Sequence, residues 1–232
     1  APLMTAMLIG LCLIAMLLDA QHNTLNIKRI ALLGVLVAIN SMLRFAEVGI
    51  PGPGGFTPVF FLIIVSGCVF GARFGFLMGA LSILVSAMVT GGVGPWLPYQ
   101  MFTAGWMGLS SGWLAALVAL FQNRRDASGG GPEAGVRPPL AAFGAVWGFA
   151  YGAILNVWFW PFTLGASDSS WHAGLTLSET VQRYAAFYAV TSLGWDIFAA
   201  IGNATLLAFF AVPAIRTLRR FKARFTFEIS AP

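Results

Sequence analysis

Charged side chains are scarce in this sequence. They make up 9% of the 232 residues, whereas hydrophobic residues make up 58%. A soluble globular domain carries about 25% charged residues, so this composition excludes a soluble globular domain. The apolar stretches are continuous rather than alternating, and this pattern indicates membrane-spanning helices rather than a transmembrane β-barrel.

Groups that could perform covalent chemistry are also few. Cys12 and Cys68 lie in apolar stretches without a partner at metal-ligand or redox spacing. The G-x-x-x-x-G-K-[ST] loop that binds nucleotide phosphates does not occur. The serines of the stretch 108–112 would need a histidine base to act as protease nucleophiles, but His22 and His172 both fall in predicted loops. We therefore expect no catalytic residue, no metal site and no cofactor.

Seven apolar segments are separated by glycine, proline and the few charges. A helix needs about 20 apolar residues to cross the hydrocarbon core, and the segments run from 15 to 31 residues. The predicted spans are residues 3–18, 27–45, 57–71, 75–90, 98–121, 140–162 and 185–215. The sequence thus predicts an all-α polytopic membrane protein with seven helices.

The basic residues predict the orientation of these spans. Eleven of the 13 lysines and arginines fall in alternate loops and the C-terminal segment, which leaves Arg44 and Arg183 for the opposite side. Positively charged loops remain in the cytoplasm, so the N-terminus is expected outside and the C-terminus inside. The basic residues lie at the ends of spans and not along one polar face, so no nucleic acid is expected as a partner.

The first apolar segment is short, and a signal peptide is the alternative interpretation. Cleavage there would place Lys28 and Arg29 outside and invert the charge pattern. We therefore interpret residues 1–26 as an additional N-terminal helix and loop, residues 27–215 as a six-helix core, and residues 216–232 as a basic cytoplasmic tail. The stretch 126–139 is rich in glycine and proline, which is typical of a flexible linker.

The loop at residues 91–100 is the most distinctive outer segment. Glycines such as Gly94 allow a close approach of the backbone to a ligand, and Trp96, Tyr99 and Gln100 offer a stacking surface and hydrogen-bonding groups. These residues are candidates for substrate binding. The alternative is a tight interhelical turn with aromatic residues of the membrane interface.

Polar side chains in the last two spans are further candidates for substrate binding. Tyr188, Trp195 and Asp196 share one stripe of the predicted last helix, with Asp196 near the middle of the bilayer. An ionisable group there usually faces the bundle interior or a cavity. Asn156 and Trp160 belong to the outer half of the preceding span. Together with the outer loop they predict a pocket that opens outward, although Asp196 and Asn156 could instead serve helix packing.

Small residues recur on the second span. Ala31, Gly34 and Ala38 follow small-x-x-x-small spacing in its cytoplasmic half. Such spacing lets another helix approach closely, so these three residues are candidates for docking a partner.

The stretches 54–61, 69–76 and 90–101 resemble the S components of energy-coupling factor (ECF) vitamin transporters, in the cobalamin-type branch. S components are the substrate-binding membrane subunits of these importers. The resemblance covers residues 27–215 and implies a six-helix fold with its N-terminus inside. The extra helix at residues 3–18 departs from that fold.

The resemblance also implies partners and a location. The chain would capture a vitamin outside a prokaryotic plasma membrane and deliver it with a transmembrane coupling subunit and two ATPase subunits. In the family an A-x-x-x-A-like motif on the first core helix docks on the coupling subunit, and Gly34 and Ala38 match it, with glycine in place of the first alanine.

The substrate expectation combines charge with resemblance. The outer face sets Arg44 and Arg183 against Glu47, Asp168 and Glu179, which disfavours a polyanionic ligand. A neutral or weakly charged, ring-bearing vitamin fits better. Cobalamin or a corrinoid precursor is expected from the resemblance, and riboflavin or another flat heterocycle is the alternative. A self-contained secondary transporter would use coupling-ion groups in the membrane, for which only an aspartate of the last span is available.

Overall fold

The computed structural model describes residues 10, 14, 27–49, 57–125, 137–163 and 169–225. All secondary structure in these residues is helical. The helices are α2 (Ile27–Gly49), α3 (Val59–Phe70), α4 (Ala72–Thr90), α5 (Leu97–Arg125), α6 (Arg137–Phe159), the short 3-10 helix η2 (Trp160–Phe162), α7 (Leu177–Thr191) and α8 (Leu193–Phe225). The predicted span 3–18 lies outside the described residues except at two positions. Of the predicted linker 126–139, residues 126–136 lie outside them, and residues 137–139 are not a linker but the first turn of α6.

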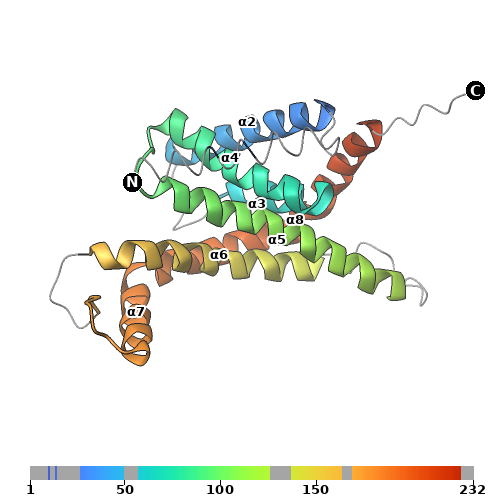
Figure 1. The fold of residues 1–232 in the computed structure, drawn as a ribbon. Coiled ribbons are helices and arrows are strands. Elements are labelled where there is room, and N and C mark those ends of the chain that lie inside the picture. The colour runs from blue at the N-terminus through green and yellow to red at the C-terminus, as the bar shows by residue number, and fades with distance from the viewer. Residues whose placement is uncertain are drawn as a thin grey trace, which may run out of the picture.

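The chain is a polytopic helical membrane protein. Five of its described helices, namely α2, α4, α5, α6 and α8, are long and apolar enough to cross a membrane. Figure 1 shows these helices and α3 running roughly along one direction, whereas α7 runs across that direction at one end of the bundle. The 12-residue α3 is highly apolar, is buried along most of its length, and packs on α4, α5 and α8.

The prediction of one helix at residues 185–215 is wrong. The chain leaves helical geometry at Ser192, where φ is −128° and ψ is −31°, and so divides into α7 and α8. The Ser192 carbonyl accepts the backbone N–H of Asp196 at 2.9 Å, and its hydroxyl donates to the Asp196 carboxylate at 2.8 Å. Asp196 therefore lies in the first turn of α8 and not within a continuous helix that crosses the middle of the bilayer. Tyr188, on α7, does not share a helical stripe with Trp195.

Helix α8 also extends further than expected. The sequence places the end of the span at residue 215 and a basic tail beyond it, but α8 continues to Phe225. Arginine and lysine are good helix formers, and their long side chains can bury the methylene stem while the charge reaches polar surroundings. Lys222 does so by donating to the carbonyl oxygen of Val69 at the C-terminal end of α3, at 2.7 Å.

Glycines bring α4 and α5 into direct backbone contact. A methyl group at Gly75 would overlap the carbonyl oxygen of Gly108, and one at Gly108 would overlap the carbonyl oxygen of Gly75. One turn away, a methyl group at Gly79 would overlap the carbonyl oxygen of Ala104. This small-x-x-x-small spacing on both helices forms what we call the α4–α5 seam.

A second seam joins α6 to α8. Gly144, Gly148 and Gly152 recur every four residues on α6, and a side chain at any of them would overlap atoms of α8. Gly148 meets the backbone of Ala200, while the Gly144 carbonyl accepts a hydrogen bond from Asn203 Nδ2 at 3.3 Å. The two seams fix four of the long helices in pairs and set the positions of polar residues on α6 and α8.

The orientation of the bundle remains a prediction from charge, and cysteine labelling tests it. In a Cys12→Ser, Cys68→Ala background, we expect an impermeant maleimide to label His172→Cys in intact cells but to label Arg124→Cys only after permeabilisation. The physical reason is the retention of basic loops in the cytoplasm. Labelling of Arg124→Cys in intact cells would contradict the orientation.

Candidate ligand-binding site

A buried carboxylate lies at the corner where α6, α7 and α8 meet. The Asp196 side chain is only 7% exposed, and its Oδ2 accepts hydrogen bonds from Tyr188 Oη and Ser192 Oγ, each at 2.8 Å. Opposite this carboxylate is Gly152 on α6, where a side chain would overlap both carboxylate oxygens. The absence of a side chain at Gly152 therefore makes room for the carboxyl group. We call Asp196, Tyr188, Ser192 and Gly152 the corner cluster.

Aromatic rings extend from the corner cluster toward η2. Trp160 is 4% exposed and donates its Nε1–H to the carbonyl oxygen of Ser169 at 2.7 Å. Its ring lies 5.4 Å from that of Tyr184, which stacks on Tyr188 at 6.3 Å between centroids. The Tyr184 hydroxyl also donates to the carbonyl oxygen of Ala153 on α6. These contacts fix α7 against α6 and provide a row of rings beside the carboxylate.

Asn156 lies one turn beyond Gly152 on α6. Its Nδ2 donates to Thr191 Oγ1 at 3.4 Å, which is long for a hydrogen bond. The Asn156 side chain is half-buried. Its amide is therefore held only weakly by α7.

A capping box determines where α7 begins. Thr176 Oγ1 accepts the backbone N–H of Glu179 at 3.3 Å, while the Glu179 carboxylate accepts the backbone N–H of Thr176 at 2.9 Å. Hydrogen bonds from Thr176 hold the pKa of Glu179 below its usual value. The box therefore sets the register in which α7 presents Tyr184 and Tyr188 to the corner.

The loop between α4 and α5 is folded on itself. Gly91 ends α4 with a left-handed φ of 71°, which favours glycine, and the Trp96 ring covers Gly94 so closely that a side chain there would overlap it. Trp96 Nε1 donates to the carbonyl oxygen of Gly92 at 3.2 Å, and 44% of the Trp96 surface remains exposed. Gln100 follows in the first turn of α5 and is half-buried.

Tyr99 connects this loop to α6, because its ring lies 5.0 Å from that of Trp158. The structure thus brings Asn156, Trp160, Tyr188 and Asp196 into one region and joins the loop to α6 through Tyr99. Trp195 is adjacent to Asp196, but its side chain is 61% exposed. The binding roles of all these residues remain predictions.

A second polar cluster was missed by the sequence analysis. At the C-terminal end of α2, Glu47 Oε2 accepts a hydrogen bond from Thr57 Oγ1 at 2.7 Å, and the charge of Arg44 acts on both Glu47 and the phenol of Tyr151 on α6. The Tyr151 ring packs on Phe60 at 4.6 Å between centroids. The sequence did contain a signal for this cluster, because an arginine and a glutamate lie three residues apart at the end of an apolar span.

The small residues of α2 face away from the bundle. Ala31, Gly34 and Ala38 are exposed, and a side chain at Gly34 would meet nothing within 4 Å among the described residues. The opposite face of the same helix buries Leu33 and Val37 in the core. The role of Ala31, Gly34 and Ala38 in docking a partner remains a prediction.

Comparison with known proteins identifies the family. A family model described as the ECF transporter, substrate-specific component matches residues 28–211, which is most of the chain. Neither the curated proteins nor the solved structures contain a match. Members of this family are transporter subunits of prokaryotic membranes and not enzymes, and they act with an energising module. The chain therefore belongs to the substrate-specific component family of ECF transporters.

Proposed function

We propose that this S component captures a ring-bearing vitamin at the outer ends of α5, α6 and α8. Cobalamin or a corrinoid precursor is the leading candidate, because the stretches 54–61, 69–76 and 90–101 resemble the cobalamin-type branch. Riboflavin or another flat heterocycle is the alternative, and the row of aromatic rings beside the corner cluster supports it.

The corner cluster is the observation that carries the proposal. A carboxylate with two hydroxyl donors, a weakly bonded amide on Asn156 and the ring of Trp160 offer both hydrogen bonds and stacking within a small region. A few convergent polar groups beside aromatic surface are typical of a small-molecule site. Asp196 and Tyr188 would orient the ligand, and Trp160 would stack on it.

The loop before α5 supplies the other wall of the proposed pocket. Trp96 has exposed ring surface over Gly94, and Tyr99 and Gln100 follow it at the start of α5. The contact between Tyr99 and Trp158 keeps this wall against α6. Trp195 would contact the ligand only from the exposed side of α8.

Transport would be completed by other subunits. Ala31, Gly34 and Ala38 on the exposed face of α2 would dock on the transmembrane coupling subunit, which two ATPase subunits drive. The open space around Gly34 supports this role, because a partner helix could approach the α2 backbone there.

Native mass spectrometry of the purified chain identifies the ligand directly. A co-purifying corrinoid is the expected result, and a flavin would favour the alternative. Retention of a polyanionic cofactor such as a nucleotide would contradict the proposed substrate class.

Single substitutions then test the pocket. We expect Trp96→Ala and Asn156→Ala each to weaken ligand binding by about 5- to 150-fold, which corresponds to about 1 to 3 kcal/mol for a lost ring contact or hydrogen bond. Calorimetry with the identified ligand measures this loss. The matched control is Trp113→Ala, an exposed tryptophan on the cytoplasmic half of α5. Unchanged affinity in both pocket variants would place the pocket elsewhere.

One observation favours a second candidate, a self-contained secondary transporter. Such transporters often bind ions beside interrupted helices, and Asp196 lies beside the interruption between α7 and α8. Uptake by the chain alone in liposomes with an imposed ion gradient would support this candidate. We expect no such uptake, because the family depends on an energising module.

A further inference from the structure

An apolar cavity of about 50 Å³ lies between α3, α5, α6 and α8, at the end of the bundle opposite the corner cluster. A single water needs about 10 to 15 Å³ measured in this way, so the cavity has room for several atoms. Its lining is apolar apart from one thiol and one guanidinium, and includes Leu114, Val118, Leu140 and Ile215. Such a lining favours a hydrocarbon chain over a polar molecule.

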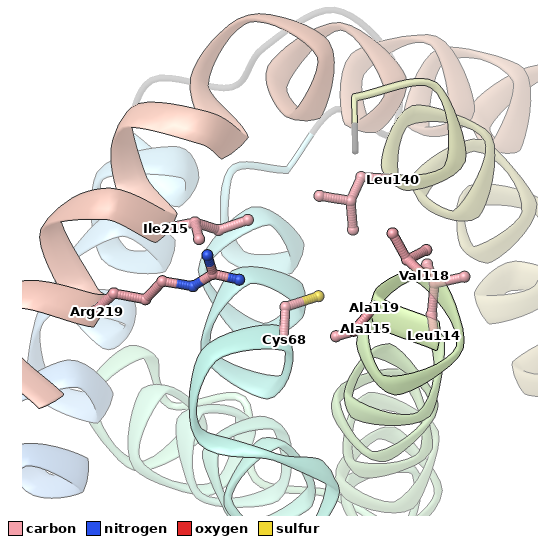
Figure 2. Close-up of a pocket in the computed structure, with 8 residues that line it drawn as sticks. All are labelled: Cys68, Leu114, Ala115, Val118, Ala119, Leu140, Ile215 and Arg219. Carbon is pink, nitrogen blue, oxygen red and sulfur yellow. The ribbon is translucent and has the colours of Figure 1, made fainter. Parts of the chain in front are cut away.

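The guanidinium belongs to Arg219 on α8. Figure 2 shows it directed toward Cys68 on α3, with the α5 side chains and Leu140 on the opposite wall. The Cys68 thiol contacts the carbonyl oxygen of Ser111 at 3.4 Å, so this thiol does not neutralise the guanidinium. The cavity thus combines a hydrocarbon-like interior with a single positive charge.

Further positive charge surrounds this end of the bundle. The charges of Arg29 and Arg219 both act on Lys222, whose amine contacts the C-terminal end of α3. Among the residues that the structure describes, the acidic side chains belong to Glu47, Glu179 and Asp196, and all three lie toward the other end. Among the described residues, this end of the bundle therefore carries the positive charge of Arg219 beside the cavity and no carboxylate.

We propose that the cavity holds a segment of an acyl chain of an anionic phospholipid whose phosphate binds Arg219. A guanidinium can donate two parallel hydrogen bonds to a phosphate, and basic pockets between helices on the cytoplasmic side suit anionic headgroups. The acyl segment lies against Leu114, Val118 and Ile215. The site is separate from the proposed vitamin pocket, so either assignment can fail without the other.

Lipid retention by the full chain tests this site. Purified protein is incubated with phosphatidylglycerol and phosphatidylcholine of identical acyl chains, and bound lipids are counted by native mass spectrometry. We expect preferential retention of phosphatidylglycerol by about fivefold, the effect of one basic residue near an anionic headgroup. Arg219→Gln should abolish the preference, and Ala115→Phe, which fills the cavity, should reduce retention of both lipids. The matched control Arg220→Gln removes the same charge from an exposed position outside the cavity and should retain the preference.

The alkylation rate of the Cys68 thiol gives a second measurement of lipid binding, and this measurement does not depend on the Ala115→Phe variant. In a Cys12→Ser background, phosphatidylglycerol should slow alkylation of Cys68 by N-ethylmaleimide, and glycerol 3-phosphate should not. Equal protection by glycerol 3-phosphate would mean a free phosphate site and overturn the lipid assignment.

Three other outcomes overturn the proposal. An equal effect of Arg219→Gln and Arg220→Gln would mean diffuse attraction to the basic surface. Equal retention of the two lipids by the unmodified chain would remove the role of the phosphate. If Ala115→Phe left lipid retention unchanged but prevented co-purification with the coupling subunit, the cavity would hold a protein segment instead.

Discussion

Replacing Gly108 with leucine is expected to leave little or no monodisperse protein after extraction from the membrane. A first side-chain atom at this position would overlap the carbonyl oxygen of Gly75, and the opposing atoms are backbone that cannot rotate away. Overpacking a core position with flexible neighbours already costs about 1 to 3 kcal/mol. The loss at a contact between two backbones should exceed this range and consume much of a typical folding stability of about 5 to 15 kcal/mol. Fluorescence-detected gel filtration of a tagged chain, followed by a thermal melt, measures the effect.

The matched control is the same substitution at Gly34. Leucine there meets open space among the described residues, so the yield and the melting temperature of Gly34→Leu should stay close to those of the unmodified chain. Gly108→Ala should be intermediate, since it adds only one carbon. A Gly108→Leu protein that melts at the unmodified temperature would contradict the backbone contact between α4 and α5.

In Gly34→Leu, vitamin uptake with the coupling module should be lost while ligand affinity is nearly intact. Gly34 lies on the exposed face of α2, toward the N-terminal end of that helix, and the corner cluster lies at the other end of the bundle. A leucine would separate the α2 backbone from a partner helix that needs a small residue to approach it. Uptake by cells that express the coupling module, and calorimetry on the isolated chain, measure the two effects separately.

Val35→Leu controls for the effect of a larger side chain on α2. Val35 is exposed but does not belong to the small-residue motif. It should support uptake at the unmodified rate. Co-purification of Gly34→Leu with the coupling subunit should be lost. If instead this variant lost ligand binding and still co-purified, the docking role of Gly34 and Ala38 would be wrong.

Hydropathy was sufficient to predict most of the bundle. The predicted spans 27–45 and 75–90 correspond to α2 and α4 within a few residues at each end. The break at Ser192 could not be predicted in this way, because apolar residues continue on both sides of it. What ends α7 is the set of local hydrogen bonds between Ser192 and Asp196, and such bonds leave no signal in hydropathy.

The glycine seams illustrate a different limit of the sequence. The chain contains 27 glycines, and spacing alone singled out Gly34, which faces outward, rather than Gly75 or Gly108, which lie between helices. Only the packing of one helix on another distinguishes a glycine that makes a close contact from one that does not. The same limit applies to Gly152, whose importance depends on the position of Asp196 on another helix.

Part of the candidate site was accessible from the sequence. An aspartate in an apolar segment is expensive unless it has partners, and this argument correctly singled out Asp196 as a buried polar group. The cluster of Arg44, Glu47 and Tyr151 was not predicted, because it joins residues about one hundred positions apart in the chain. Pairing across such a distance follows from the arrangement of α2 and α6.

The shortness of α3 has an electrical consequence. Its 12 residues correspond to about 18 Å, little more than half of a hydrocarbon core about 30 Å thick. The groups hydrogen-bonded near its two ends, Glu47 to Thr57 and Lys222 to Val69, are therefore separated along α3 by less than the thickness of that core. A voltage across the membrane acts on a charge according to the fraction of the potential drop that separates it from the aqueous phase. The potential difference between these two side chains is thus only a part of the voltage across the membrane.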